Sequence, residues 1–257
     1  SRIKPQIIYQ CATYGAVPDQ HDIIRSGEVN VMGTINLVEA LVKVGGYECL
    51  VNTGSSAEYG RKSKPMSETD RLEPNTAYGA TKAGAALFCE AIARSKKQPI
   101  LNLKLTSPFG PYDEGTRLIP SVIRKCLAGQ DPELSTGTES RSFFFIDDLM
   151  DLYLEIPQVS WAPGETVIAG PEQQYSVRDI ATRIIRLTGT AVTPRFGALP
   201  PRDFDTDFWM ADISKAKKMF GWQPTTDIDE GLKRTIKWHK NFDWQRYQLS
   251  PMTIGKG

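Results

Sequence analysis

Short apolar runs alternate with amphipathic stretches in the first part of the chain. The runs at 6–11 (QIIYQC), 48–53 (ECLVNT) and 100–106 (ILNLKLT) are typical of buried strands. Residues 22–44 and 77–97 instead repeat apolar side chains at helical spacing. This β-α-β-α-β order predicts an α/β protein in which helices cover the faces of a parallel sheet.

The pattern after residue 107 is less regular and predicts a smaller α+β lobe packed on the sheet. No internal repeat or long linker separates the two parts. Helices are expected at 117–127, 147–156, 176–187, 212–220 and 227–242, and strands at 142–146 and 166–169.

Composition narrows the classes of partner. The 31 Lys and Arg residues balance 30 Asp and Glu residues, so neither nucleic acid nor an anionic membrane is expected as a partner. No apolar run reaches the roughly 18–20 residues of a membrane-spanning helix, and no signal peptide is visible. The 4 Cys and 2 His residues show no metal-ligand spacing. A cytoplasmic protein with reduced thiols and no metal site is therefore expected.

Candidate catalytic residues lie at the predicted carboxyl edge of the sheet, where open parallel sheets bind ligands. Ser55 follows the second predicted strand, and Tyr78 and Lys82 lie four residues apart at the start of the next helix. A lysine ammonium beside a phenol would lower the tyrosine pKa from about 10, which would make Tyr78 a general acid or base. Ser55 could hydrogen-bond the same substrate oxygen.

Several ordered segments together carry a resemblance to a known family. The chain resembles the extended short-chain dehydrogenase/reductases of the nucleotide-sugar epimerase/dehydratase group, from about residue 7 to residue 238. The matching strings are NVMGTINL at 30–37, SSAEYG at 55–60, YGATK at 78–82, GPY at 110–112, RLIP at 117–120, RSFFFIDD at 141–148, DISKAK at 212–217 and GWQP at 221–224.

The resemblance implies a Rossmann-like, doubly wound parallel sheet that binds NAD or NADP, with a lobe that binds a nucleotide sugar. Residues 1–106 and about 142–170 would form an incomplete dinucleotide-binding domain, and 107–141 and 171–257 the substrate lobe. The implied catalytic residues are Ser55, Tyr78 and Lys82, with Lys82 also holding the nicotinamide ribose. The implied cofactor-binding residues are Cys11, Ala12, Lys82, Ser107 and Pro108, and the implied substrate-binding residues are Ser56, Arg117, Arg141 and Arg202.

One departure from the family sharpens the expected reaction. Sugar 4,6-dehydratases of the family place an acidic pair directly after the catalytic Ser or Thr, whereas Ser56 and Ala57 stand here. Glu58 comes one residue too late, and strand-like alternation would point it elsewhere. Dehydration and decarboxylation are therefore disfavoured, which leaves a 4-keto reductase or a 4-epimerase. The strings at 54–60 and 110–120 most resemble those of enzymes that reduce a 4-keto-6-deoxy nucleotide sugar. A nucleotide-sugar 4-epimerase stays as an alternative, as does a non-catalytic relative that binds a nucleotide or a partner.

The front of the family pattern is not found in this sequence. No Gly-x-x-Gly-x-x-Gly string occurs, and the first strand, at 6–11, corresponds to the family's fourth. About 60 residues with the phosphate loop are thus expected to be lacking, and a fragment unable to bind cofactor is a further alternative. NAD and NADP cannot be told apart without that part. The resemblance also implies a homodimer formed through the helices at 22–44 and 77–97.

Overall fold

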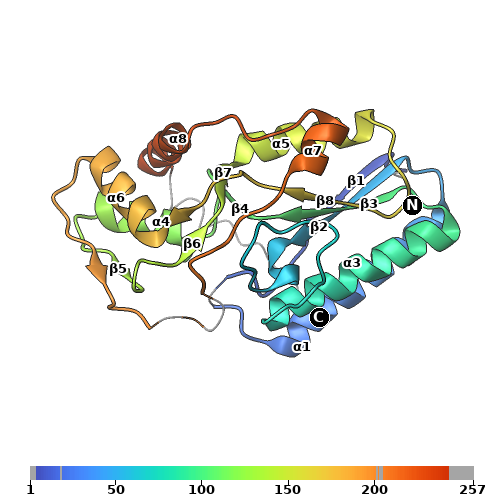
Figure 1. Cartoon of the computed structure of the whole chain (residues 1–257), viewed down its shortest axis with the longest axis horizontal. Helices are drawn as coiled ribbons and strands as arrows, with labels where there is room; N and C mark the ends of the chain where they lie inside the picture. The colour runs from blue at the N-terminus through green and yellow to red at the C-terminus, as the bar shows by residue number, and fades with distance from the viewer. Residues whose placement is uncertain (1–3, 18, 201, 203–204, 243–257) are drawn as a thin grey trace.

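A four-stranded parallel sheet forms the centre of the computed structural model, which describes residues 4–17, 19–200, 202 and 205–242. Its order is β1 (Ile7–Gln10), β2 (Cys49–Ser55), β3 (Ile100–Leu105) and β8 (Glu165–Ala169), and all neighbours run parallel. The predicted parallel sheet is therefore confirmed. All carboxyl ends point toward the same end of the molecule, where the second lobe lies (Figure 1).

Helices cover both faces of this sheet (Figure 1). One face carries a continuous run of α1 (Ile23–Ser26), η1 (Gly27–Met32) and α2 (Gly33–Val44), together with α3 (Ala77–Lys96). The other face carries α5 (Ile146–Glu155) and α7 (Ser214–Phe220). The helix expected at 22–44 is thus present, but η1, which lies within it, is a π-helical segment. Apolar periodicity does not reveal it, since six residues are too few to separate a π turn from an α turn.

The second lobe is built from helices and very short strands. Its helices are α4 (Leu118–Leu127), α6 (Val177–Thr188) and α8 (Ile228–Asn241), as the sequence predicts. The strand at 143–145 lies within the strand expected at 142–146, whereas the other strands of two or three residues escape prediction because they are too short to show alternation. They pair as β4 (Ser107–Phe109) with β7 (Phe143–Phe145), β5 (Glu133–Leu134) with β10 (Arg195–Phe196), and β6 (Ser140–Arg141) with β9 (Tyr175–Ser176).

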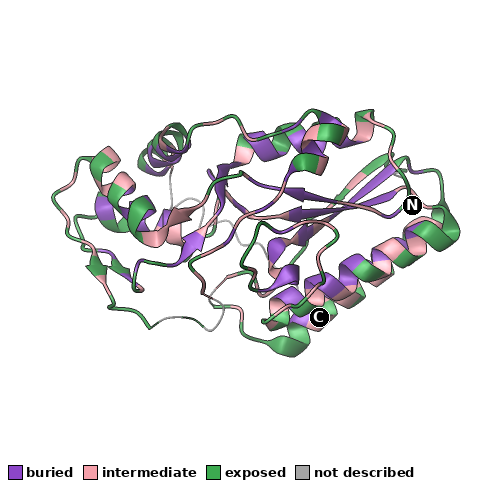
Figure 2. Ribbon diagram, in the orientation of Figure 1, coloured by how far each residue is buried: buried purple, intermediate pink, exposed green. Residues whose placement is uncertain are grey.

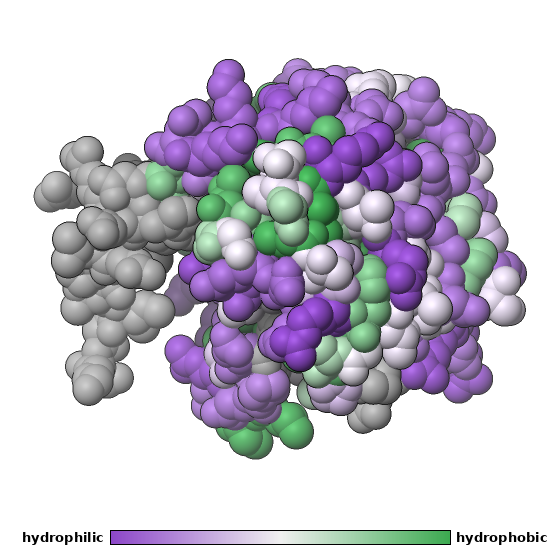
Figure 3. Space-filling model, turned by 90° about the vertical axis from the view of Figure 1, so that its left-hand side faces the viewer, coloured by the Kyte–Doolittle hydropathy of each residue, from purple (hydrophilic) through white to green (hydrophobic). Residues whose placement is uncertain are grey.

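Burial follows this layered arrangement. The central strands β2 and β3 are almost wholly buried, whereas β1 alternates between exposed and half-buried positions (Figure 2). In the lobe, α6 turns Ile180 and Ile184 into the core. Hydrophilic side chains cover much of the outer face at the α6 end of the molecule, with smaller hydrophobic areas between them (Figure 3). No helix in the described part of the chain is both long and apolar enough to cross a bilayer.

The buried carboxylate of Asp148 links the turn before α8 to α5, which covers one face of the sheet. Asp148 of α5 accepts hydrogen bonds from the backbone N–H groups and hydroxyls of Thr225 and Thr226, at 3.1–3.3 Å. Its own carbonyl accepts from the indole of Trp222 at 2.7 Å. The turn before α8 is thereby tied to the first turn of α5, which follows β7 directly.

We expect Asp148→Ala to lower the free energy of unfolding by about 2–3 kcal/mol, because four donors lose a buried acceptor. Urea denaturation followed by circular dichroism measures the loss. The neighbouring Asp147→Ala is the control: Asp147 is exposed and pairs with Arg234, so its loss should cost less than about 1 kcal/mol. Equal losses in the two variants would contradict this role for Asp148.

Candidate active site

The turn after β2 fixes the position of Ser55. Ser55 caps the 3₁₀ turn η2 (Ser56–Tyr59): its Oγ accepts from the Ala57 N–H at 3.2 Å, and its own N–H donates to Glu58 Oε1 at 2.8 Å. This reciprocal capping box holds both the backbone and the side chain of Ser55. Glu58 consequently points into the core. The expectation that it avoids the site is confirmed, although a capping turn, and not strand alternation, is the cause.

The start of α3 packs directly against this turn. Thr76 caps the helix by accepting from the Gly79 N–H at 3.0 Å. A Cβ on Gly79 would lie 2.4 Å from the carbonyl oxygen of Ala57, so only glycine permits this approach. Tyr78 is thereby brought beside Ser55, and the two side chains hydrogen-bond.

The environment of Tyr78 corrects one expectation. Burial raises the pKa of the Tyr78 phenol above its usual value, and hydrogen bonds with Ser55 and Thr13 oppose this only in part. Arg117 also lowers that pKa. The prediction of a lowered Tyr78 pKa is wrong in this structure, because burial of the phenol outweighs the groups that lower it. The Lys82 ammonium donates to the carbonyl oxygen of Thr53. Tyr78 is therefore held in its protonated form, which is the form that donates a proton.

Lys82 lies behind the phenol, one helical turn along α3. Its side chain is buried, and its ammonium donates to the Thr53 carbonyl of β2. The Thr53 hydroxyl lies 2.6 Å from the Tyr153 hydroxyl and 3.5 Å from the thiol of Cys11. Cys11 and Lys82 thus meet at Thr53, on the edge of the sheet where β1 and β2 end. Cys11 is the exposed thiol; the other three cysteines are buried, and all four are free.

Asn30 organises the loop after β1 and was missed from the sequence. It is fully buried in the π segment η1. Its side-chain oxygen accepts from the Tyr14 N–H at 2.8 Å and from the Thr13 hydroxyl at 3.3 Å, and its amide donates to Tyr14 O at 2.8 Å and Thr81 Oγ at 2.9 Å. The loop that places Thr13 near the Tyr78 phenol is therefore tied to both helices. The position of Asn30 in the string at 30–37 is the sequence signal that could have identified this residue.

Two adjoining cavities lie at the carboxyl edge of the sheet. One, of about 340 Å³, is lined by Ser55, Ser56 and Tyr78. The other, of about 260 Å³, extends into the lobe and is lined by the predicted residues Ser107, Pro108, Arg117 and Arg202. Arg141, Ser107 and Ala16 line both cavities, so the two are continuous.

The larger set of predicted site residues therefore divides into two groups. Ser55, Ser56, Tyr78, Ser107, Pro108, Arg117, Arg141 and Arg202 border these cavities. Lys82, Cys11 and Ala12 border neither cavity. Lys82 donates to the Thr53 carbonyl, and Cys11 and Ala12 follow β1.

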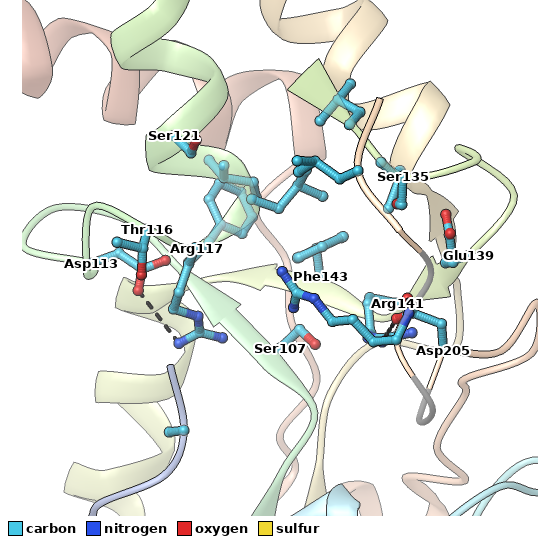
Figure 4. A pocket seen from close by; sticks show the side chains of 18 of the residues that line it. Ser107, Asp113, Thr116, Arg117, Ser121, Ser135, Glu139, Arg141, Phe143 and Asp205 are labelled. Carbon is cyan, nitrogen blue, oxygen red and sulfur yellow. Dashed lines mark hydrogen bonds and ion pairs between the residues drawn. The ribbon is translucent and has the colours of Figure 1, made fainter. Parts of the chain in front are cut away.

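Arginines from different elements surround the lobe cavity (Figure 4). Arg117, at the start of α4, pairs with Asp113 at 3.4 Å. Arg141, at the end of β6, pairs with Asp205 at 2.9 Å. Asp205 also accepts from the Arg202 backbone N–H at 2.9 Å. Guanidinium groups, which suit the oxygens of phosphates, thus face the cavity from several sides, together with the carboxylates of Asp113, Glu133, Glu139 and Asp205.

Trp209 lies between Ser56 and Arg141. Its indole N–H donates to the Ser56 hydroxyl at 3.0 Å, and the Arg141 guanidinium lies 5.3 Å from its ring centre. Ser56 is itself buried. Trp209 and the exposed His21, which also borders the cavity, had no signal in the sequence. Both reach the site only through the fold.

Comparison with known proteins places the chain in a family. Residues 1–169 match the NAD dependent epimerase/dehydratase family, so the chain belongs to that family. The family resemblance and the Rossmann-like fold inferred from the sequence are confirmed.

Two relatives and one solved structure illustrate the range of the family. A trifunctional UDP-glucose 4,6-dehydratase/UDP-4-keto-6-deoxy-D-glucose 3,5-epimerase/UDP-4-keto-L-rhamnose-reductase of Arabidopsis thaliana is 27% identical over 84% of this chain, which spans 33% of its length. A UDP-glucuronate 4-epimerase of Thermodesulfobacterium geofontis is 31% identical over 82% of this chain, which spans 65% of it. The structure of MoeE5 in complex with UDP-glucose and NAD is 26% identical, with a TM-score of 0.84 over 95% of this chain and 80% of that one.

We expect Asn30→Ala to free the loop at 13–15, because three loop hydrogen bonds lose their partner. Hydrogen–deuterium exchange should show lost protection at the Tyr14 amide, and unfolding free energy should fall by about 2 kcal/mol. Asn36→Ala, at an exposed position of the following helix, is the control and should leave both quantities unchanged. Unaltered exchange at the loop in Asn30→Ala would rule out this anchoring role.

Proposed function

We propose that the protein reduces the C4 ketone of a nucleotide-linked 6-deoxy sugar with NADH or NADPH. The observation that carries the proposal is the cavity shared by Ser55 and Tyr78. Among its described lining residues there is no carboxylate. Elimination of water from the sugar needs an acid and a base beyond the tyrosine, whereas ketone reduction needs one proton donor.

The bound cofactor would supply the hydride, and the residues of the chain would supply the proton and the geometry. Tyr78 would donate its phenolic proton to the C4 oxygen as charge develops there. At neutral pH the phenol is protonated, which is the form that this step needs. Ser55, locked by its capping box, would donate a hydrogen bond to the same oxygen.

Lys82 fits the role of holding the nicotinamide ribose. An ammonium has three hydrogens, and one of them goes to the Thr53 carbonyl. The other two would donate to the hydroxyls of a bound ribose, and burial of the side chain restricts the ammonium. Cys11, Ala12, Ser107 and Pro108 would border the dinucleotide at the same edge of the sheet. This donor set suits NAD and NADP equally, since the two differ away from the nicotinamide.

The lobe cavity would hold the nucleotide diphosphate. Arg117, Arg141 and Arg202 border it, and Ser56 lies where the sugar would enter the catalytic cavity. Because Arg141 borders both cavities, it would mark the junction of the diphosphate and the sugar. A nucleotide sugar is accordingly the proposed partner.

A 4-epimerase uses the same residues and is the second candidate. It is favoured by the relatives, which include a UDP-glucuronate 4-epimerase. An epimerase reoxidises its cofactor in each cycle, whereas a reductase consumes one reduced cofactor per sugar. Incubation of nucleotide sugars with trace and with stoichiometric cofactor separates the two activities. Cofactor or nucleotide binding without turnover would instead indicate a non-catalytic relative.

We expect Tyr78→Phe to abolish turnover, with a loss of at least about a hundredfold, because the proton donor is removed. Turnover is followed by cofactor absorbance with a 4-keto-6-deoxy nucleotide sugar, using NADH and NADPH in parallel. The melting temperature and the cofactor affinity, from fluorescence titration, should stay near those of the unaltered protein. Tyr47→Phe, whose hydroxyl contacts Gln98 far from the site, is the control. Near-normal turnover in Tyr78→Phe would refute the assignment.

We also propose a homodimer formed through α1, α2 and α3. Apolar side chains are exposed on this side of the molecule: Ile24 by 73%, Met32 by 51% and Leu87 by 54%. Burying such side chains against a second copy would remove them from water.

Light scattering at micromolar concentration should therefore give a dimer, and the double variant Ile24→Asp, Leu87→Asp should give a monomer. The control is Leu154→Asp, since Leu154 is 66% exposed on α5, on the opposite face of the sheet. A monomer before any substitution would disprove the arrangement.

A further inference from the structure

Glu58 is a buried carboxylate that the proposed chemistry does not use. It lies in the turn between Ser55 and Tyr59, its side chain is wholly buried, and it borders neither cavity. A carboxylate in such a place is costly unless it is paired and hydrogen-bonded. What it contacts therefore indicates what it does.

Each oxygen of Glu58 faces a donor. Oε1 accepts from the Ser55 N–H at 2.8 Å, and Oε2 lies 3.1 Å from the ammonium of Lys104. The Lys104 side chain is only 5% exposed, and its ammonium also lies 4.4 Å from the ring centre of Tyr59. Burial raises the pKa of Glu58, and Lys104, the Ser55 N–H and Lys82 oppose that rise. Donors at both oxygens suit the ionised carboxylate, which only accepts hydrogen bonds. The ion pair is thus buried beside the turn that carries Ser55.

Stability alone is a weak reason for such a pair. Replacing a buried ion pair by apolar residues of similar size is often neutral or stabilising. An apolar side chain in place of Glu58 would, however, leave the Ser55 N–H without its acceptor and break the capping box. The contacts of Glu58 therefore indicate a role in the geometry and the charge of the neighbouring candidate site.

The charge of Glu58 reaches Lys82. Burial lowers the pKa of the Lys82 ammonium, and Glu58 is the first of the groups that raise it again. The others are Cys11, at the end of β1, and Cys89, on α3 itself. The Thr53 carbonyl of β2 faces the same ammonium. Glu58 in turn is faced by Lys104 from β3 and by Lys82 from α3.

We propose that Glu58 is a positioning residue, which holds Ser55 through its capping bond and keeps Lys82 charged, with Lys104 as the counterion. This inference rests on the proposed roles of Ser55, Tyr78 and Lys82. Glu58 acts through these residues and does not touch the substrate. The Glu58–Lys104 pair would thus join two parts of the catalytic set that come from different elements of the fold.

The direction of the pH effect follows from the signs of the charges. A negative Glu58 favours the charged form of Lys82, so its removal lowers the pKa of Lys82. It also raises the pKa of Tyr78, so its removal lowers that pKa as well. With both pKa values lowered, Lys82 and Tyr78 lose their protons at lower pH than before. The alkaline limb of the pH–rate profile therefore moves to lower pH when Glu58 is neutralised.

The test uses the double variant Glu58→Gln, Lys104→Met. Glutamine can still accept from the Ser55 N–H, and removal of Lys104 avoids leaving an unpaired buried ammonium, which could prevent folding. Glu68→Gln is the matched control, because Glu68 accepts from the Ile168 N–H at 2.9 Å, between α7 and the sheet. The Lys82 ammonium is titrated by NMR on protein labelled at the lysine side chains, with Lys82→Arg to assign its signal.

We expect the double variant to fold, to titrate Lys82 at lower pH, and to lose about tenfold to a hundredfold in kcat with little change in KM. Glu68→Gln should change neither quantity. A double variant that keeps the Lys82 titration and the pH–rate profile overturns the inference. The NMR titration needs no turnover. Absence of reductase activity would therefore count against the proposed function, while an unmoved titration counts against Glu58.

Discussion

The close approach of α3 to the turn after β2 is the contact on which the active site depends. A Cβ on Gly79 would lie 2.4 Å from the Ala57 carbonyl oxygen, so no larger residue fits there. This contact sets the position of Tyr78 beside Ser55, and Lys82 follows one helical turn later, where its ammonium reaches Thr53. The proposed catalytic residues are therefore held in a defined geometry by the fold itself.

The main elements of the fold could be predicted from the sequence because they are long and periodic. Buried strands at the centre of a parallel sheet are continuous apolar runs, and the helices that cover them show clear stripes. Apart from β7, within the strand expected at 142–146, the short strands of the lobe could not be found in this way. The π segment was also invisible, although it is the segment that carries Asn30 to the loop at 13–15.

Candidate site residues could be predicted from the sequence where they belong to a string with a known pattern. Ser55, Tyr78 and Arg141 are of this kind, and the structure brings them to one pair of cavities. Trp209 was not accessible, because it meets Ser56 across 153 residues of chain. The influence of Lys82 on Tyr78 was misjudged for a related reason. Spacing of four residues gives a shared helix face, but it does not give the direction of a side chain or the burial that dominates the phenol pKa.

The proposed reduction is tested most directly by following the hydride. NADH or NADPH carrying deuterium at the transferring position of the nicotinamide is incubated with the protein and a 4-keto-6-deoxy nucleotide sugar. Mass spectrometry and NMR should find one deuterium at C4 of the sugar for each cofactor oxidised. A protein that binds both molecules but places no deuterium at C4 would contradict the proposed roles of Ser55, Tyr78 and Lys82.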